Sequence, residues 1–215
     1  MRARTAWTAA QGEPAVTLLL RHGQTPMSVQ KRYAGRSDVP LTDAGVAQAA
    51  AAAKRLASAG IAAIVASPLQ RTVQTAEQVA AVTGLPVVTE NGFRETDFGA
   101  WEGLTFAEVR ERWPSEMTAW LADPEIAPPG GESFAEVSER VTAALHRVLA
   151  GRTGQRLLIV SHVTPIKTLV AAALLAPPAA LYRMHLDVAA LCEIDYYADG
   201  PAVLRTFNDT AHLSS

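Results

Sequence analysis

Four short apolar runs, separated by long stretches of helical composition, constrain this chain more than any other feature of its sequence. The runs cover residues 16–21, 61–66, 86–89 and 156–161 and are rich in valine, leucine, isoleucine and alanine. Each has the length of a strand that is buried on both faces. Strands that alternate with helices in this way are typical of a parallel sheet. The sequence therefore predicts an α/β protein with three layers (αβα), in which helices cover both faces of a mostly parallel sheet.

Capping residues mark three helices between these strands. Thr42 can cap a helix that Gly60 ends, and the next helix has Pro68 near its start and Gly84 just past its end. An S-x-x-E capping box begins at Ser133 and predicts a helix over 133–150. A further helix is expected after Thr164.

The rest of the chain departs from the strand and helix alternation. Residues 191–197 and 202–208 alternate in polarity and predict an antiparallel pair of strands at one end of the sheet. Residues 99–131 are richer in tryptophan, proline and glycine, with short helical pieces. We expect this segment to fold over one face of the sheet.

Composition places the chain in a broad class. With 215 residues, 49% of them hydrophobic, it can bury one core, so residues 15–215 are expected to form one domain after a tail or linker over 1–14. The 19 basic and 21 acidic residues balance, which predicts no direct nucleic-acid binding and no attraction to a membrane. Cys192 is the only cysteine and cannot form an internal disulfide, which fits a reducing compartment. The sequence has no apolar run long enough for a membrane span and no signal peptide, so a cytoplasmic location is expected.

Two histidines follow predicted strands directly. His22 follows the first strand and His162 follows the fourth. Because ligand sites in open parallel sheets lie beyond the carboxyl ends of the strands, both imidazoles are expected in one crevice.

Two arginines give that crevice a chemical character. Arg21 precedes His22, and Arg71 lies in the first turn of the helix after the second strand. A guanidinium is always charged and offers a planar fork of donors that matches a phosphate group. The helix starts after Gly23, around Pro68 and at Thr164 are expected to add backbone N–H donors. The sequence predicts a phosphate site.

A carboxyl group beside such a site would repel the ligand unless it carries a proton, which it can then give to a leaving oxygen. Glu95 is the first choice for this general acid. Asp97 and Glu102 belong to the same segment, and spacing alone does not choose among the three.

The motifs "LLLRHGQT", "SPLQRTVQTA", "RETDFGAWEG" and "VSHVTP" occur in this order, and together they resemble the histidine phosphatase superfamily, the phosphoglycerate mutase-like proteins. The resemblance extends from about residue 16 to the end of the chain and implies the phosphoglycerate mutase-like fold.

The resemblance also implies a role for each site residue. His22 would be the nucleophile that becomes phosphorylated, and Glu95 the proton donor. The phosphoryl group would be held by Arg21, Arg71 and His162. The expected substrate-binding residues are Gln24, Thr25, Ser28, Gly35 and Val163. No metal and no cofactor are expected. The attack needs a neutral His22, and two flanking guanidiniums lower the pKa of an imidazole from about 6.5.

Residues outside the shared motifs favour hydrolysis over mutase activity. Mutases of this family have a long basic segment where residues 99–131 are short and partly acidic. They also carry Gly-Asn where this chain has Val163 and Thr164, and Asn where it has Ser28. A cofactor-dependent phosphoglycerate mutase remains the alternative.

Two further likenesses concern the type of phosphatase. "DFGAWEGLTFAEV" and "PGGESFAEV" resemble the alpha-ribazole phosphatase type, and "SHVTPIKTL" resembles the acid-phosphatase half of actinobacterial proteins that begin with a ribonuclease H domain. The first implies a small phosphate ester such as alpha-ribazole phosphate as the substrate. The second implies fusion to an upstream ribonuclease H domain.

Other classes of function stay open at this point. A metal-dependent hydrolase could use His22, His162, Glu95 and Asp97, but two adjacent guanidiniums would repel a divalent cation. A non-catalytic domain that binds phosphorylated ligands would have the same pocket. A homodimer paired through the closing strand is a further possibility.

Overall fold

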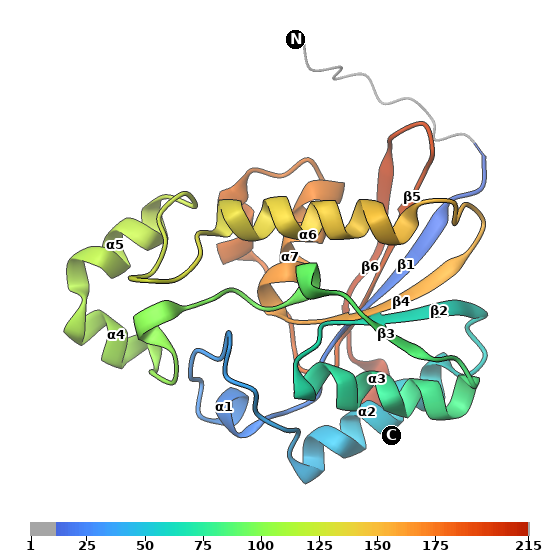
Figure 1. Cartoon of the computed structure of the whole chain (residues 1–215), viewed down its shortest axis with the longest axis horizontal. Helices are drawn as coiled ribbons and strands as arrows, with labels where there is room; N and C mark the ends of the chain where they lie inside the picture. Colours follow the sequence, from blue (N-terminus) through green and yellow to red (C-terminus); the bar gives the residue numbers. More distant parts are fainter. Residues whose placement is uncertain (1–11, 215) are drawn as a thin grey trace.

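The computed structural model describes residues 12–214 and contains one six-stranded sheet (Figure 1). The strands are β1 (Ala15–Arg21), β2 (Ile61–Ala66), β3 (Val87–Thr89), β4 (Arg156–Ser161), β5 (Leu191–Tyr196) and β6 (Ala202–Asp209), in the order β3-β2-β4-β1-β5-β6. The first four are parallel, and β5 runs antiparallel to both β1 and β6. The mostly parallel sheet and the antiparallel closing pair are confirmed.

Helices cover both faces of this sheet, which confirms the three-layer fold (Figure 1). One face carries α2 (Asp43–Leu56) and α3 (Gln70–Thr83), and the other carries α6 (Phe134–Leu149) and α7 (Val163–Ala173). The alternation along β1 decides the faces: Leu18 and Leu20 pack with α2 and α3, whereas Leu19 packs with α6 and α7. The strands are thus buried from both sides.

The helix ends show which capping signals the chain uses. Thr42 caps α2 by accepting from the Gly45 N–H, Gly84 ends α3 with a φ of 73°, and the capping box of Ser133 begins α6. Two expectations were wrong. Helix α2 ends at Leu56 rather than near Gly60, because residues 57–60 form the turn into β2. Pro68 precedes the N-cap of α3 and lies outside the helix.

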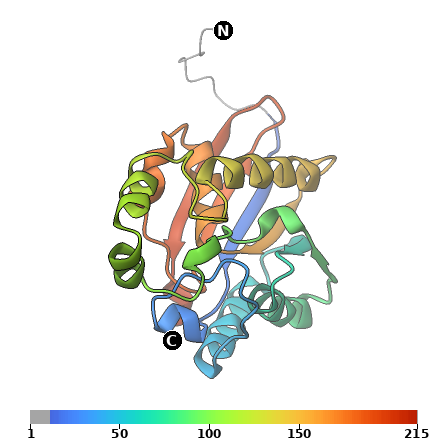
Figure 2. The ribbon, with the colours of Figure 1, turned by 60° about the vertical axis from the view of Figure 1, so that its left-hand side comes forward.

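The segment over 99–131 forms two short helices beyond the sheet, α4 (Phe106–Arg112) and α5 (Pro114–Ala122). Figure 2 shows them at the left-hand edge of the molecule, and one side chain of each, Phe106 and Trp120, lines the same cavity as His22. An apolar cluster attaches them to α6 and α7, with Trp101 and Trp120 as its largest side chains. The excursion therefore makes one wall of the region into which β1 and β4 point.

The remaining short elements complete the chain. They are α1 (Pro26–Val29) and the 3₁₀ helices η1 (Asn91–Phe93), η2 (Gly99–Trp101), η3 (Pro178–Arg183) and η4 (Ala211–Leu213). Among the described residues, no helix is both long and apolar enough to cross a bilayer. The predicted tail over 1–14 falls mostly outside the described residues, and it stays a prediction.

Candidate active site

Strand pairing brings the two histidines together. In the parallel register of β1 with β4, Arg21 lies opposite Ser161, and the His22 N–H donates to the Ser161 carbonyl oxygen at 3.0 Å. The next residue on each strand is a histidine, and the two ring centroids lie 5.2 Å apart. The structure therefore places the two imidazoles next to each other, as the two strand ends predicted, but only His22 lines the cavity.

The His22 ring is buried, and one of its nitrogens has a fixed role. Its Nδ1 lies 2.8 Å from the carbonyl oxygen of Gly23, which can only accept, so Nδ1 carries the proton. Burial lowers the pKa of His22 well below 6.5, and the charges of Arg21 and Arg71 lower it further. A neutral ring with its proton on Nδ1 has a lone pair on Nε2, and Nε2 has no hydrogen bond to residues 12–214.

Arg21 is only partly paired. Its Nη1 donates to the Leu186 carbonyl oxygen at 2.6 Å, while Nε is buried with no partner in the described part of the chain. Burial lowers the pKa of Arg21 to about 10, although the nearby carboxylates of Glu95 and Asp187 oppose this shift. A buried guanidinium with an unpartnered donor is ready to bind an anion.

Arg71 is held more tightly, at 1% exposure. Its Nη atoms donate to the carbonyl oxygens of Ala34, Gly35 and Ser37, and its Nε donates to His162 Nδ1 at 3.2 Å. The guanidinium still lies on the wall of the cavity next to His22. Its position depends on the loop over residues 34–37.

His162 lies behind Arg71 rather than on the cavity wall. Because its Nδ1 accepts from the always-protonated Arg71, Nε2 must carry the ring proton of the neutral form, and it donates to Ser67 Oγ at 2.8 Å. The ring is fully buried, and burial followed by the charge of Arg71 lowers its pKa well below 6.5. In this arrangement both ring nitrogens are engaged, and direct contact of His162 with a phosphoryl group stays a prediction.

Glu95 lies on the cavity wall, held by the N-terminus of α7. Its carboxylate accepts from the backbone N–H groups of Thr96 at 2.9 Å, Val163 at 3.1 Å and Thr164 at 3.2 Å. The amides at the start of α7 therefore bind this carboxylate rather than a phosphate, which differs from the prediction from the sequence. The α7 dipole and the three donors fix the orientation of the carboxyl group.

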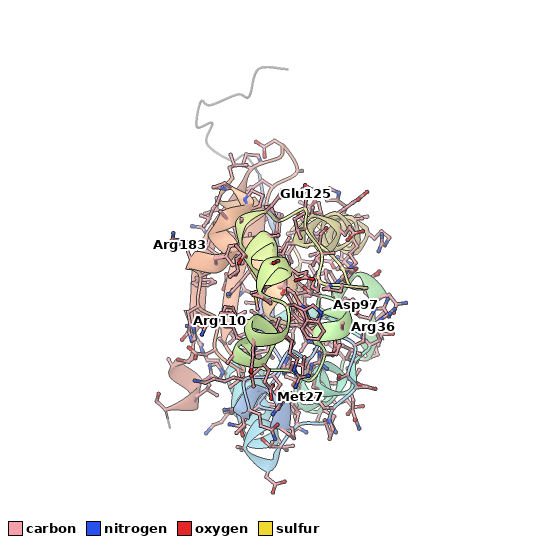
Figure 3. All side chains as sticks on the ribbon, turned by 90° about the vertical axis from the view of Figure 1, so that its left-hand side faces the viewer. Met27, Arg36, Asp97, Arg110, Glu125 and Arg183 are labelled. Carbon is pink, nitrogen blue, oxygen red and sulfur yellow. The ribbon has the colours of Figure 1, made fainter. Side chains whose placement is uncertain are left out.

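The competing carboxyl groups have other partners. Glu102 accepts from the N–H groups of Gly35 and Arg36 and from the Ser37 hydroxyl. Asp97 forms an ion pair of 3.0 Å with Arg36, and the two lie side by side at the surface in Figure 3. Neither lines the cavity that holds His22, so the structure singles out Glu95 among the three.

Some of the predicted substrate-binding residues line the cavity, and others pack behind it. Thr25, Ser28 and Val163 line the cavity, and the first two form the capping box of α1. Gln24 points away from it and accepts from the Thr42 hydroxyl at 2.9 Å. Gly35 is also outside this cavity, and it holds Arg71 through its carbonyl oxygen.

Gly23 serves packing rather than ligand binding. A Cβ atom there would lie 2.4 Å from the carbonyl oxygen of Gly45 on α2, so only glycine allows this approach. The Gly23 N–H donates to the Thr75 hydroxyl. This amide is therefore engaged by a side chain of the protein.

The cavity has a volume of about 430 Å³ and contains residues that sequence reasoning did not identify. Two are cationic, Arg32 after α1 and Lys167 on α7. Lys167 follows Val163 by four residues and so shares its helix face, which is the signal that could have found it. Burial lowers the pKa of Lys167, and its Nζ donates to the Leu181 carbonyl oxygen at 3.2 Å. Among the described residues, no group of three metal-ligating side chains lies close enough together to bind a metal ion.

Comparison with protein families gives one match that spans the domain. The family model described as the histidine phosphatase superfamily (branch 1) matches residues 17–210. The bifunctional protein Rv2228c of Mycobacterium tuberculosis is 51% identical over 208 residues, which are 96% of this chain and 57% of that protein. This chain therefore spans little more than half of the relative's length. The probable phosphoglycerate mutase GpmB of Proteus mirabilis is 37% identical over 204 residues, covering 91% of this chain and 94% of that protein.

Solved structures have the same fold. Mycobacterial glucosyl-3-phosphoglycerate phosphatase Rv2419c, in complex with VO3, superposes with a TM-score of 0.83 at 31% identity, covering 91% of this chain and all of that chain. A putative alpha-ribazole-5'-P phosphatase from Escherichia coli superposes with a TM-score of 0.83 at 27% identity, covering 91% of this chain and 97% of that one.

Proposed function

Since this chain belongs to the histidine phosphatase superfamily, we propose that it hydrolyses phosphate monoesters through a phosphohistidine formed on His22. One observation carries the proposal. The Nδ1 proton of His22 is bound by the Gly23 carbonyl oxygen, which leaves Nε2 as the nucleophilic atom beside Arg21, Arg71 and Glu95. Nucleophile, cations and acid thus share one cavity.

In the first step, His22 Nε2 attacks phosphorus, and an N–P bond forms as the bond from phosphorus to the alcohol oxygen breaks. Glu95 gives its proton to the departing alkoxide, so a neutral alcohol leaves. Arg21 and Arg71 neutralise the charge that spreads over the phosphoryl oxygens. This electrostatic stabilisation is expected to be large because His22, Arg71 and Glu95 are buried and Arg21 is partly buried.

In the second step, a water molecule attacks the phosphorus of phosphohistidine. The Glu95 carboxylate takes a proton from that water, the N–P bond breaks, and its electron pair returns to Nε2. Inorganic phosphate leaves, and His22 and Glu95 regain their starting forms. The same carboxyl group serves as acid and then as base.

The cavity lining supports hydrolysis over phosphate transfer between two substrate positions. A mutase must hold a bisphosphate, which calls for cations on both sides of the nucleophile. Here most of the remaining lining consists of aromatic and aliphatic side chains. Of the two further cations, Arg32 is already paired with Glu108 at 2.9 Å, and Lys167 donates to the Leu181 carbonyl oxygen. Phosphoglycerate mutase activity is the second candidate function, because one relative is named a probable phosphoglycerate mutase.

The substrate is proposed to be a small phosphate ester. Named neighbours act on glucosyl-3-phosphoglycerate or are described as alpha-ribazole-5'-P phosphatases, and alpha-ribazole phosphate is one candidate. This chain matches only 57% of the length of a relative that is named a bifunctional protein. We likewise propose that a ribonuclease H domain lies upstream of this domain in the whole protein.

The proposal is tested with a phosphate ester labelled in its phosphoryl group. Wild-type protein quenched in alkali is expected to carry acid-labile label, and His22→Ala protein is expected to carry none and to lose phosphate release by several orders of magnitude. His146→Ala, on the surface of α6, is the matched control. Equal rates of phosphate release by the wild type and His22→Ala would refute the role of His22.

A further inference from the structure

The cavity that holds His22 is lined by two chemically different sets of residues. One set is Arg21, Arg71 and Glu95, which we call the floor, and the other consists of Phe98, Trp120 and other aromatic residues, which we call the aromatic half. The proposed chemistry uses the floor alone. The aromatic half is therefore available to recognise whatever is attached to the phosphate.

Five aromatic rings in the aromatic half form a continuous surface, which we call the aromatic wall: Tyr33, Phe98, Trp120, Phe134 and Tyr182. Neighbouring centroids lie between 4.7 Å (Tyr33 to Phe98) and 6.3 Å (Tyr33 to Trp120). The Tyr182 hydroxyl donates to the Trp120 carbonyl oxygen at 2.8 Å, which ties η3 to α5. The wall is thus assembled from segments far apart in the sequence and braced across them.

Core packing explains only part of this arrangement. Trp101, Val109 and Met117 are buried in the same cluster and help to attach α4 and α5, yet none of them lines the cavity. Phe106 and Leu121 do line it, and they remain 44% and 40% exposed. Apolar side chains that stay partly exposed at a concave surface are a sign of ligand binding.

The cavity is also larger than a phosphate group requires. Its volume of about 430 Å³ lies within the range of sites that enclose a whole small molecule. Rings in such a wall prefer a flat apolar group, which they contact by stacking or edge-to-face.

We propose that the alcohol part of the substrate carries a flat apolar group, such as an aromatic ring, which packs against the aromatic wall while the phosphate lies on the cationic floor. This inference rests on the proposed function only in that the phosphate must bind beside Arg21 and Arg71. It does not depend on whether hydrolysis follows.

Binding of non-hydrolysable phosphonates tests the inference apart from catalysis. Propylphosphonate and 3-phenylpropylphosphonate have the same head group and the same linker, and they differ by one phenyl ring. We expect the phenyl compound to bind at least roughly tenfold more tightly in calorimetric titrations. Equal dissociation constants for the two compounds would overturn the inference.

A variant of the aromatic wall links the preference to it. Tyr33→Leu removes one partly exposed ring of the wall, and it is expected to reduce the preference for the phenyl compound by at least roughly threefold. Val88→Ala, an exposed apolar residue on β3, is the matched control and is expected to keep the full preference. A preference that survives in Tyr33→Leu would contradict the assignment of the ring to this wall.

The two proposals fail in different ways. Protein that binds 3-phenylpropylphosphonate preferentially but forms no phosphohistidine refutes the hydrolysis and supports the recognition. Protein that hydrolyses propyl phosphate and 3-phenylpropyl phosphate with equal kcat/KM refutes the recognition and supports the hydrolysis. The two alcohols have similar acidity, so leaving-group chemistry does not distort the comparison.

Discussion

Arg140 Nη2 donates a hydrogen bond of 2.9 Å to the carbonyl oxygen of Glu95. The same guanidinium, on α6, donates to the carbonyl oxygens of Gly92 and Arg94 and forms two bonds with the Glu132 carboxylate. Glu132 in turn accepts from the Asp97 N–H. Arg140 and Glu132 thus hold the backbone on both sides of Glu95, and they position the side chain that the proposed mechanism uses as acid and base.

Replacing Arg140 with alanine should therefore weaken general acid catalysis. We expect kcat to fall at least tenfold for an alkyl phosphate, whose leaving group needs a proton, and by much less for 4-nitrophenyl phosphate, whose leaving group does not. Glu95→Gln should give the same pattern. Arg147 also lies on α6, and Arg147→Ala, which removes a surface ion pair with Glu90, is the control. An equal loss for both substrates would indicate a general structural defect instead.

Glu102 is expected to control phosphate affinity through Arg71. Its carboxylate holds the loop over residues 34–37, whose carbonyl oxygens accept from the Arg71 guanidinium. Glu102→Ala frees that loop, and inorganic phosphate should bind roughly three- to tenfold more weakly, corresponding to about 1 kcal/mol. Calorimetric titration measures this change. Glu111→Ala, exposed on α4, should bind phosphate like the wild type, and unchanged affinity in Glu102→Ala would show that the loop does not position Arg71.

Lys167 should contribute to anion binding by charge alone. It lies on the cavity wall, and it has no ion pair among residues 12–214. Lys167→Met keeps most of the side-chain volume and removes one positive charge. Phosphate affinity at low salt is expected to fall about tenfold, and the difference should shrink as salt rises. Lys54→Met, exposed on α2, is the control, and a salt-independent loss would argue for a structural cause.

The two buried histidines should make the protein less stable in acid. Burial lowers the pKa values of His22 and His162 in the folded state, while those of the unfolded chain stay near 6.5. Above that pH neither state binds the protons. Below it the unfolded chain binds more protons than the folded one, so the free energy of unfolding falls, by up to about 1.4 kcal/mol per pH unit for each imidazole.

Urea denaturation between pH 7.5 and pH 5 measures this slope. His162→Gln should remove about half of the part due to the two rings, since glutamine does not titrate. His185→Gln is the control because that ring is 80% exposed. A slope that His162→Gln leaves unchanged would contradict the assignment.

The sequence by itself determined the framework of this protein. Apolar runs of four to six residues define the strands because a strand buried on both faces needs no polar alternation, and the capping signals at Thr42, Gly84 and Ser133 act through neighbours three or four residues away. These are local effects. For the same reason, residues directly after strands, such as His22 and His162, could be assigned to one edge of the sheet.

The tertiary structure decided how the site residues are used. His162 binds Arg71 and Ser67, the amides at the start of α7 bind Glu95, and Glu102 supports a loop. Each of these hydrogen bonds joins residues that are far apart in the chain, so the spacing of residues in the sequence does not predict them. The aromatic wall is the clearest case, since η3, α5, α6 and two loops supply its rings. The hydrophobic effect is non-directional, so the apolar composition of a chain predicts that a core forms. It does not predict which aromatic rings line a cavity, because that depends on how the elements pack.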